Sequence, residues 1–348
     1  MSLLDRIWYQ KIGLLNAPII LPLLPLTALF KHLSKVRRDK YKKGIKPSLR
    51  TKVPVIVVGG ISVGGTGKTP LCIALLQKLN DLGYKVGLLS RGYKGKAEHY
   101  PYIVETTSNV KESGDEPLLI KMSVKNKAVV VVDPNRERGA QYLEHLGVDV
   151  IVTDDGLQHY ALQRDIEIIV LDGKRMLGNG LLLPAGPLRE GEWRLKTTDL
   201  VVTNGTPTNS KYDSEVMQLR PSQAVSIDSF CSKTEGHEYL QVGTKIIALA
   251  GIGNPKRFYK TLEDCGYLIE SSIDIGDHGL VSKKTLENLS VKYPIVMTAK
   301  DAVKYAQYKI NNLYVLNVEA ELSDNFYSKI ADKLYDLVEA YESKSENS

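Results

Sequence analysis

Cysteine is scarce in this chain of 348 residues, and the cysteines that it has are far apart. There are three, Cys72, Cys231 and Cys265, and no two are spaced as CxxC. Such an odd, scattered set predicts neither a disulfide framework nor a zinc site. No internal repeat is visible. We expect a globular protein of a reducing compartment, which at 43% hydrophobic residues is long enough for two domains.

The body of the chain also lacks an excess of positive charge. The segment Lys31 to Lys52, here called the basic collar, has ten lysines and arginines and one aspartate, a local charge of +9. Because the whole chain carries +6, the remainder carries −3. A nucleic-acid-binding protein would carry positive charge across its folded surface, so no nucleic-acid partner is expected, and no protein partner is inferred. The collar directly follows an apolar segment, and this pairing predicts a membrane surface as partner.

The apolar segment Ile12 to Phe30 is 19 residues long, near the length of a bilayer span. Its prolines Pro18, Pro22 and Pro25 are expected to break a continuous helix. No small-residue cleavage site follows it, so a secretory signal peptide is not expected. We expect a broken amphipathic arm that inserts into one leaflet, with the basic collar against anionic headgroups. Packing of the arm against the protein's own core is the alternative.

A strand-like apolar run, a glycine-rich loop and a helical pattern follow one another in Val53 to Pro70, VPVIVVGGISVGGTGKTP. This is the order of a P-loop, in which backbone N–H groups and a helix N-terminus bind a polyphosphate. Lys68 would contact the β- and γ-phosphates, and the Thr69 hydroxyl would bind Mg²⁺. Ser62 replaces the first glycine of the usual pattern, but Gly64-Gly65 still allow a tight loop. The predicted cofactors are ATP and Mg²⁺, and the predicted nucleotide ligands are Ser62, Val63, Gly64, Gly65, Thr66, Gly67, Lys68 and Thr69.

Two acidic elements accompany this loop. Asp154 and Asp155 follow the strand pattern Val148 to Thr153, where a P-loop enzyme needs a carboxylate for Mg²⁺. An Asp-Gly turn with solvated carboxylates is the alternative. Asp115 and Glu116 could include a base that accepts a proton from a substrate hydroxyl, or they could be an N-cap and a first-turn charge of the next helix.

Further polar residues lie in predicted loops. His278 follows Asp277 in a glycine-containing segment and could relay a proton, although a lone histidine is more often structural. The planar guanidinium of arginine suits phosphate, and surface solvation is the alternative for each loop arginine. The candidate substrate contacts are Arg136, Arg189, Gln158 and His159.

Strand patterns alternate with helical patterns along most of the chain. This alternation predicts the α/β class, with a P-loop NTPase-like doubly wound parallel sheet that binds ligands at the carboxyl ends of its strands. A change of composition near residues 204–222 predicts a second, smaller α/β domain. The expected divisions are an N-terminal membrane-associating arm with the collar (1–52), a P-loop kinase core (53–205), a linker (206–222), the smaller domain (223–320) and a C-terminal helix with a short tail (321–348).

Several motifs occur in the order found in one family: GGTGKTP, SRGY, GDEP, DDGLQH, LLPAGPLRE and AGIGNPKRF, together with Asp277-His278 and the apolar arm. Over nearly its whole length the chain thus resembles the tetraacyldisaccharide 4′-kinase (lipid A 4′-kinase) family. The resemblance implies an ATP-dependent kinase that phosphorylates the 4′-hydroxyl of tetraacyldisaccharide 1-phosphate to form lipid IVA in lipid A biosynthesis. It also implies a lipid disaccharide substrate, a place at the cytoplasmic face of the bacterial inner membrane, and a smaller domain that closes over the nucleotide.

The resemblance also implies roles for individual residues. It makes Asp115 the catalytic base, paired with His278, with Lys68 as the third catalytic residue. Its metal-side residues are Thr69, Asp154, Asp155 and Glu116. Its residues for substrate handling are Arg189, Glu190 and an arginine in the region of Arg136.

A membrane-associated P-loop partitioning or maturation ATPase is the alternative class. The deviant P-loop of such a protein would carry lysine at position 63, where this chain has Val63. Transfer of phosphate to a lipid would select the kinase, and hydrolysis without transfer would select the ATPase.

Overall fold

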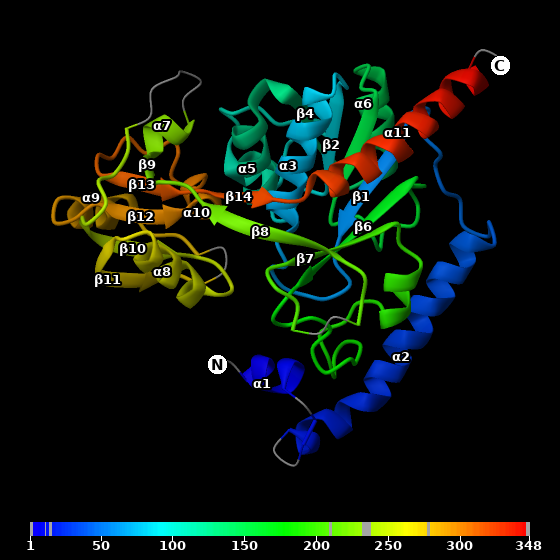
Figure 1. Cartoon of the computed structure of the whole chain (residues 1–348), viewed down its shortest axis with the longest axis horizontal. Coiled ribbons are helices and arrows are strands. Elements are labelled where there is room, and N and C mark those ends of the chain that lie inside the picture. The colour runs from blue at the N-terminus through cyan, green and yellow to red at the C-terminus, as the bar shows by residue number, and fades with distance from the viewer. Residues whose placement is uncertain are drawn as a thin grey trace.

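The structure, a computed structural model, describes residues 3–10, 12–13, 16–208, 211–231, 238–276 and 279–345. The chain forms two sheets with helices around them, and an N-terminal arm extends from the larger sheet (Figure 1). Asp277 and His278, which the sequence singles out as a functional pair, lie outside the described residues.

The larger sheet has nine strands in the order β14-β8-β7-β6-β1-β5-β2-β4-β3. The strands from β8 to β4 are parallel, and β14 and β3 pair antiparallel at the two edges. Their bounds are β1 (Val55–Gly59), β2 (Val86–Ser90), β3 (Tyr102–Ile103), β4 (Ala128–Val132), β5 (Val150–Asp154), β6 (Ile166–Asp172), β7 (Leu200–Asn204), β8 (Glu215–Pro221) and β14 (Val318–Glu321). Strand β1 lies between β5 and β6, so its carboxyl end is at the middle of the sheet edge.

Helices cover both faces of this sheet, as a doubly wound fold requires. Successive residues of β1 pack into different cores: Ile56 joins one core with α3 (Lys68–Asp81), α5 (Asp115–Val124) and α11 (Asp324–Ser345). Val57 joins the other core with α6 (Arg136–His145). This alternation is the period-two pattern of a strand buried on both sides. The predicted doubly wound sheet is confirmed, and the C-terminal helix α11 covers the larger sheet beside α3. The short helices are α4 (Val110–Ser113), η1 (Lys125–Lys127) and η2 (Glu192–Lys196).

The second sheet has the order β11-β10-β12-β13-β9, with β9 antiparallel to β13 and the other strands parallel. Its strands are β9 (Val225–Ser226), β10 (Lys245–Ala250), β11 (Leu268–Asp274), β12 (Ile295–Thr298) and β13 (Leu313–Leu316). Its helices are α7 (Ile227–Cys231), α8 (Pro255–Asp264), α9 (Lys283–Ser290) and α10 (Ala299–Ala302). This second α/β unit, as predicted, lies beside the larger sheet, and its α10 contacts α5 (Figure 1).

The structure differs from the sequence expectation where the two units join. Strand β8 occupies part of the expected linker, 206–222, and continues the larger sheet beside β7. Strand β14 pairs with β8 and not with the second sheet, although most of it was expected in the smaller domain. Most residues of both strands are at least partly exposed, so these strands lack the apolar run that marks the central strands.

The arm consists of α1 (Leu3–Tyr9) and α2 (Ala17–Lys42). The predicted break is wrong, because α2 is one continuous helix through Pro22 and Pro25. Pro22 and Pro25 each remove one N–H donor from the helix interior. Pro18 costs no hydrogen bond, because it lies in the first turn, where backbone N–H groups have no partner within a helix. The remaining bonds keep the helix intact, and the basic residues up to Lys42 belong to this same helix.

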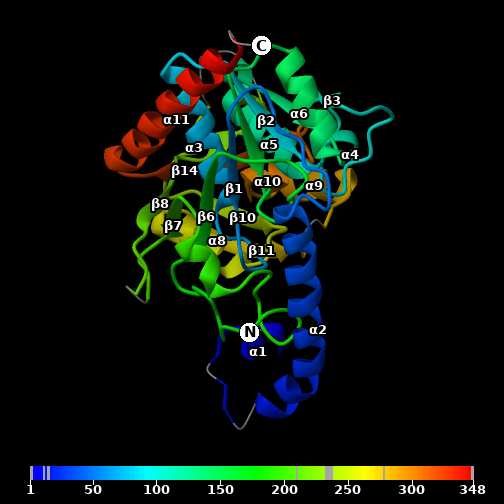
Figure 2. The same cartoon turned by 90° about the vertical axis from the view of Figure 1, so that its right-hand side faces the viewer.

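One side of α2 packs on the protein and the rest is exposed. Ile20 is buried in a small cluster with Ala185, and the Thr27 hydroxyl accepts a hydrogen bond from Ala185 N at 3.1 Å. By contrast Leu21 is 60% exposed and Leu29 54%. Within the described residues, α2 is the one helix whose length and composition suit a membrane span. Figure 2 shows its N-terminal half extending beyond both sheets.

Candidate active site

The loop between β1 and α3 has the geometry that phosphate binding requires. Gly67 precedes α3 with φ +98°, and a Cβ at this position would lie 2.6 Å from Nδ2 of Asn204, so only glycine fits. Gly64 also has a positive φ, +103°. The exposed backbone at Gly64 and Gly65 leads into the N-terminus of α3, where free N–H groups and the helix dipole favour an anion.

Two other segments hold this loop in place. Asn204, at the end of β7, donates from Nδ2 to the carbonyl of Thr66 at 3.1 Å. Val63 N donates to the carbonyl of Pro187 at 2.9 Å, and Ser62 forms a bridge with the residue after that proline. Ser62 and Val63 were predicted as nucleotide ligands, and in this structure they tie the loop to the protein. Asn204 was not predicted; its signal was a polar side chain at the end of an apolar strand.

Lys68 and Asp155 meet at the carboxyl ends of β1 and β5, with Nζ 3.6 Å from Oδ1. Arg189 Nη1 lies 2.8 Å from the other oxygen of Asp155. Burial raises the pKa of Asp155, but the charges of Lys68 and Arg189 outweigh it and leave that pKa below its ordinary value. Asp155 has φ +46°, a left-handed backbone conformation that residues other than glycine seldom adopt. The structure thus brings three predicted site residues together.

Asp154 lies beside this group and is 3% exposed. Burial, with repulsion from Glu116 and Asp155, raises the pKa of Asp154 to about 7. One buried oxygen of Asp154 and one of Asp155 have no hydrogen-bond partner among the described residues. Buried carboxylate oxygens that accept no hydrogen bond, beside a phosphate-binding loop, suit a hard cation such as Mg²⁺.

The protein side chains alone do not form a closed metal cage. No group of three or more His, Cys, Asp or Glu side chains in the described part of the chain is arranged to hold a metal. Mg²⁺ at a kinase site needs only one or two protein ligands, because phosphates and water supply the rest. Thr69 follows Lys68 in the first turn of α3, and Glu116 is close enough to raise the pKa of Asp154. The residues present therefore fit a Mg²⁺ shared with phosphate.

Asp115 and Glu116 occupy the first turn of α5, where their charges favour the helix dipole. Neither is the N-cap that the sequence allowed, since Gly114 holds that position with φ +84°. Both carboxylates face the second unit: Asp115 Oδ2 lies 4.0 Å from Nζ of Lys304, and Glu116 Oε1 lies 3.2 Å from Nζ of Lys300. The pairing of Asp115 with His278 stays a prediction, because His278 is outside the described residues.

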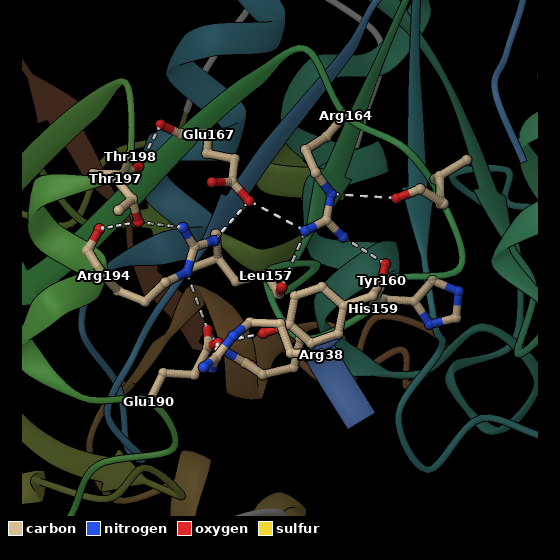
Figure 3. Close-up of polar contacts among 12 residues, drawn as sticks. Arg38, Leu157, His159, Tyr160, Arg164, Glu167, Glu190, Arg194, Thr197 and Thr198 are labelled. Carbon is tan, nitrogen blue, oxygen red and sulfur yellow. Dashed lines mark hydrogen bonds and ion pairs between the residues drawn. The ribbon is translucent and has the colours of Figure 1, made fainter. Parts of the chain in front are cut away.

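Glu190 lies at the centre of a buried polar network (Figure 3). Its carboxylate contacts the side chains of Tyr160, Gln158 at 3.0 Å, Arg194 at 3.4 Å and Arg38 at 3.9 Å. Arg194 reaches on to Glu167, and Arg38 comes from α2 (Figure 3). Gln158 also accepts from Arg189 at 3.4 Å, which connects the network to the acidic site. The network therefore links the arm to the site through two predicted substrate residues, Gln158 and Glu190.

Two other predicted substrate residues have protein partners. Arg136 is 4% exposed and donates from Nη2 to the carbonyl of Asp154 at 2.7 Å. This placement favours support of the acidic turn over direct contact with a substrate. Nε2 of His159 lies 3.0 Å from Oε2 of Glu137, and burial lowers the pKa of His159 in spite of that hydrogen bond.

A P-loop after a central parallel strand, with strand-end carboxylates beside it, defines a nucleotide-binding protein of the P-loop class. Within that class, the family model described as tetraacyldisaccharide-1-P 4′-kinase, LpxK, matches residues 19–335. The chain belongs to this family.

Individual relatives agree with the family match. The chain is 41% identical over 341 residues to the tetraacyldisaccharide 4′-kinase of Aliivibrio fischeri, covering 97% of this chain and 100% of that protein. It is 41% identical over 346 residues to the kinase of the same name from Vibrio cholerae, covering 99% and 100%. A crystal structure of LpxK from Aquifex aeolicus in complex with ATP has a TM-score of 0.75 and 28% identity, covering 92% of this chain and 99% of that one. The predicted family and kinase class are confirmed, and the alternative ATPase class is not favoured.

Proposed function

We propose that this chain transfers the γ-phosphoryl group of ATP to the 4′-hydroxyl of a tetraacyldisaccharide 1-phosphate, forming lipid IVA. The observation that carries the proposal is the meeting of Lys68, Asp155 and Arg189 at the end of β1. The ATP bound to the related Aquifex aeolicus protein supports ATP as the phosphoryl donor. The names of the relatives support the lipid disaccharide as the acceptor.

The P-loop would hold the phosphates and stabilise their charge. Lys68 and the N–H groups from Gly64 to Thr69 are placed at one helix N-terminus, where they can bind oxygens of the β- and γ-phosphates. Mg²⁺, when bound, would neutralise part of the phosphate charge. Its ligands would come from Thr69, Asp154, Asp155 and Glu116. Arg189 would keep the Asp155 carboxylate oriented while Lys68 turns to phosphate.

Asp115 would act as the general base. As the 4′-oxygen of the sugar attacks the γ-phosphorus, its proton passes to the Asp115 carboxylate, and the bond between that phosphorus and the leaving oxygen of ADP breaks. We place His278 beside Asp115 as a partner in this step, from the DH motif alone. Gln158, His159 and Arg189 would contact the disaccharide. The buried Glu190 would act by positioning Gln158, and Arg136 would act through the acidic turn.

We place the enzyme at the cytoplasmic face of the inner membrane, where ATP and an acylated substrate meet. The exposed apolar side of α2 supports insertion of the arm, since Leu21 and Leu29 are 60% and 54% exposed. The basic residues that follow in α2 would face anionic headgroups. We also propose that residues 53–205 and 223–320 form the bulk of two domains that close around the nucleotide.

Thin-layer separation of products from ³²P-labelled ATP, with the lipid disaccharide in detergent micelles, tests this function. Label that moves with the lipid supports the kinase. Label released only as inorganic phosphate would select the alternative ATPase.

A further inference from the structure

Lys304 is a buried lysine in the second unit, and the proposed mechanism does not use it. Its side chain is 3% exposed. It follows α10, the helix of the second unit that contacts α5. A buried ammonium group must have partners for its three N–H donors, because an unpaired buried charge is strongly unfavourable.

The second unit supplies partners on one side of this ammonium. Nζ donates to Oδ1 of Asp301 at 2.8 Å and to the carbonyl of Gly279 at 3.4 Å. Asp301 is itself completely buried. Its Oδ2 accepts from Gly251 N at 2.8 Å and from the Thr298 hydroxyl at 2.7 Å. The Asp301 carboxylate is thus fixed at the carboxyl ends of β10 and β12, and the position of the Lys304 ammonium is fixed with it.

A second carboxylate, which forms an ion pair with this ammonium, lies in the other unit. Nζ of Lys304 is 4.0 Å from Oδ2 of Asp115, whose side chain is 15% exposed. Asp115 begins α5 in the larger unit, and its N-cap Gly114 is closely packed, since a Cβ there would lie 2.9 Å from the carbonyl oxygen of Tyr93. The backbone of Asp115 is therefore set by the larger unit, and one carboxylate oxygen faces a cation set by the second unit.

We propose that Lys304 is a positioning residue for phosphoryl transfer: from the second unit it orients the Asp115 carboxylate toward the substrate hydroxyl. This inference rests on the proposed function, in which Asp115 is the base. A carboxylate that rotates freely would spend little time in line with the hydroxyl proton, and misplacement by about 1 Å costs roughly 100-fold in rate. Phosphoryl transfer would then depend on the docking of the second unit through a group that touches neither ATP nor sugar.

The decisive experiment compares lipid phosphorylation by three variants of the full-length protein. Lys304→Met removes the charge at similar size. Lys304→Met/Asp301→Asn removes both charges of the buried pair, so that no unpaired carboxylate remains to unfold the second unit. The matched control is Lys245→Met, which removes an exposed ion pair of the same unit at 3.1 Å from Glu270.

We expect kcat to fall at least about tenfold in both Lys304 variants, with KM for ATP changed by less than about twofold, since orientation of a base acts in the transition state. In an Asp115→Asn background, Lys304→Met should cause no further loss. Lys245→Met should keep the wild-type kcat. If the single variant does not fold, the charge-neutral double variant decides.

Two results would overturn the inference alone: wild-type kcat in a folded Lys304 variant, or an equal loss from Lys304→Met with and without Asp115. A wild-type protein that transfers nothing to the lipid would overturn the proposed function and this inference together.

Discussion

Lys68 of the P-loop and Asp155 of the neighbouring strand end form an ion pair, with Nζ 3.6 Å from Oδ1. Asp155 keeps a second cation, Arg189, at 2.8 Å on its other oxygen. Lys68 can therefore turn to a phosphate without leaving a bare carboxylate. The pair marks where the phosphoryl group is expected to lie.

Lys68→Ala should reduce kcat for lipid phosphorylation by at least about 100-fold, because the lysine charge is needed where charge develops on the transferred phosphate. The fold should persist, since Asp155 retains Arg189. Product formation and the melting temperature should be measured together. Lys333→Ala, which breaks only an exposed ion pair with Asp199, is the control. Near-normal transfer by Lys68→Ala would remove the P-loop from the active site.

Gly67→Ala should abolish ATP binding. A Cβ at Gly67 would meet Nδ2 of Asn204 at 2.6 Å, on a residue that already has φ +98°. Gly83→Ala is the matched control, because Gly83 has φ +96° with open space around it and should lose only about 1 kcal/mol to backbone strain. Calorimetric titration with ATP measures the affinity of each variant and distinguishes Gly67→Ala from Gly83→Ala. Equal ATP affinity in both variants would show that the Asn204 contact does not shape the loop.

Asp154→Asn should stabilise the ligand-free protein at pH 8 more than at pH 5. The folded protein keeps the Asp154 proton up to a pKa of about 7, raised mainly by burial, against 3.8 ordinarily. The folded state thus binds more protons than the unfolded state between these values, so stability falls as pH rises through this window. Asparagine at position 154 stays neutral at both pH values, so the variant avoids that loss of folding stability at the higher pH.

The measurement is the difference in melting temperature between variant and wild type at both pH values, without Mg²⁺. Asp332→Asn, on an exposed position of α11, is the matched control. A constant difference for Asp154→Asn would mean that Asp154 is ionised throughout this range.

Replacing Leu21, Leu26 and Leu29 by serine should make membrane binding sensitive to salt. These side chains are 60%, 54% and 54% exposed, and the buried Ile20 contact of the arm is left intact. The basic residues of α2 would then supply the remaining attraction, which salt screens. Sedimentation with anionic vesicles at low and high salt measures this.

Leu82→Ser/Val291→Ser, which alters exposed apolar residues away from the arm, should bind vesicles like the wild type. Release of the wild type by salt alone would contradict insertion of α2.

The features that the sequence predicts well are local in the chain. Apolar runs such as those of β1 and β5 are continuous, and the glycines, Lys68 and Thr69 adjoin one of them. The proximity of Asp155 and Lys68 can then be predicted without tertiary contacts, because both follow parallel strands, whose carboxyl ends share one edge of the sheet. The family motifs add roles to residues that already stand out.

The contacts that the sequence could not predict join residues that are far apart in the chain. Asn204 bonds to the loop across 138 residues, and Lys304 reaches Asp115 from another unit. Arg136 is of the residue type that binds phosphate, but it is buried and donates a hydrogen bond to the carbonyl of Asp154. The prolines of α2 were expected to end a helix that in fact continues, since proline disfavours helix without forbidding it.

The position of the transferred phosphate tests the central claim most directly. Purified tetraacyldisaccharide 1-phosphate should be incubated with the protein, ATP and Mg²⁺, and the lipid product analysed by mass spectrometry and ³¹P NMR. We predict a gain of one phosphoryl group, with the new phosphorus coupled to the proton at the 4′ carbon, and no such product from Lys68→Ala. ATP hydrolysis with an unchanged lipid, or a phosphate on any other hydroxyl, would contradict it.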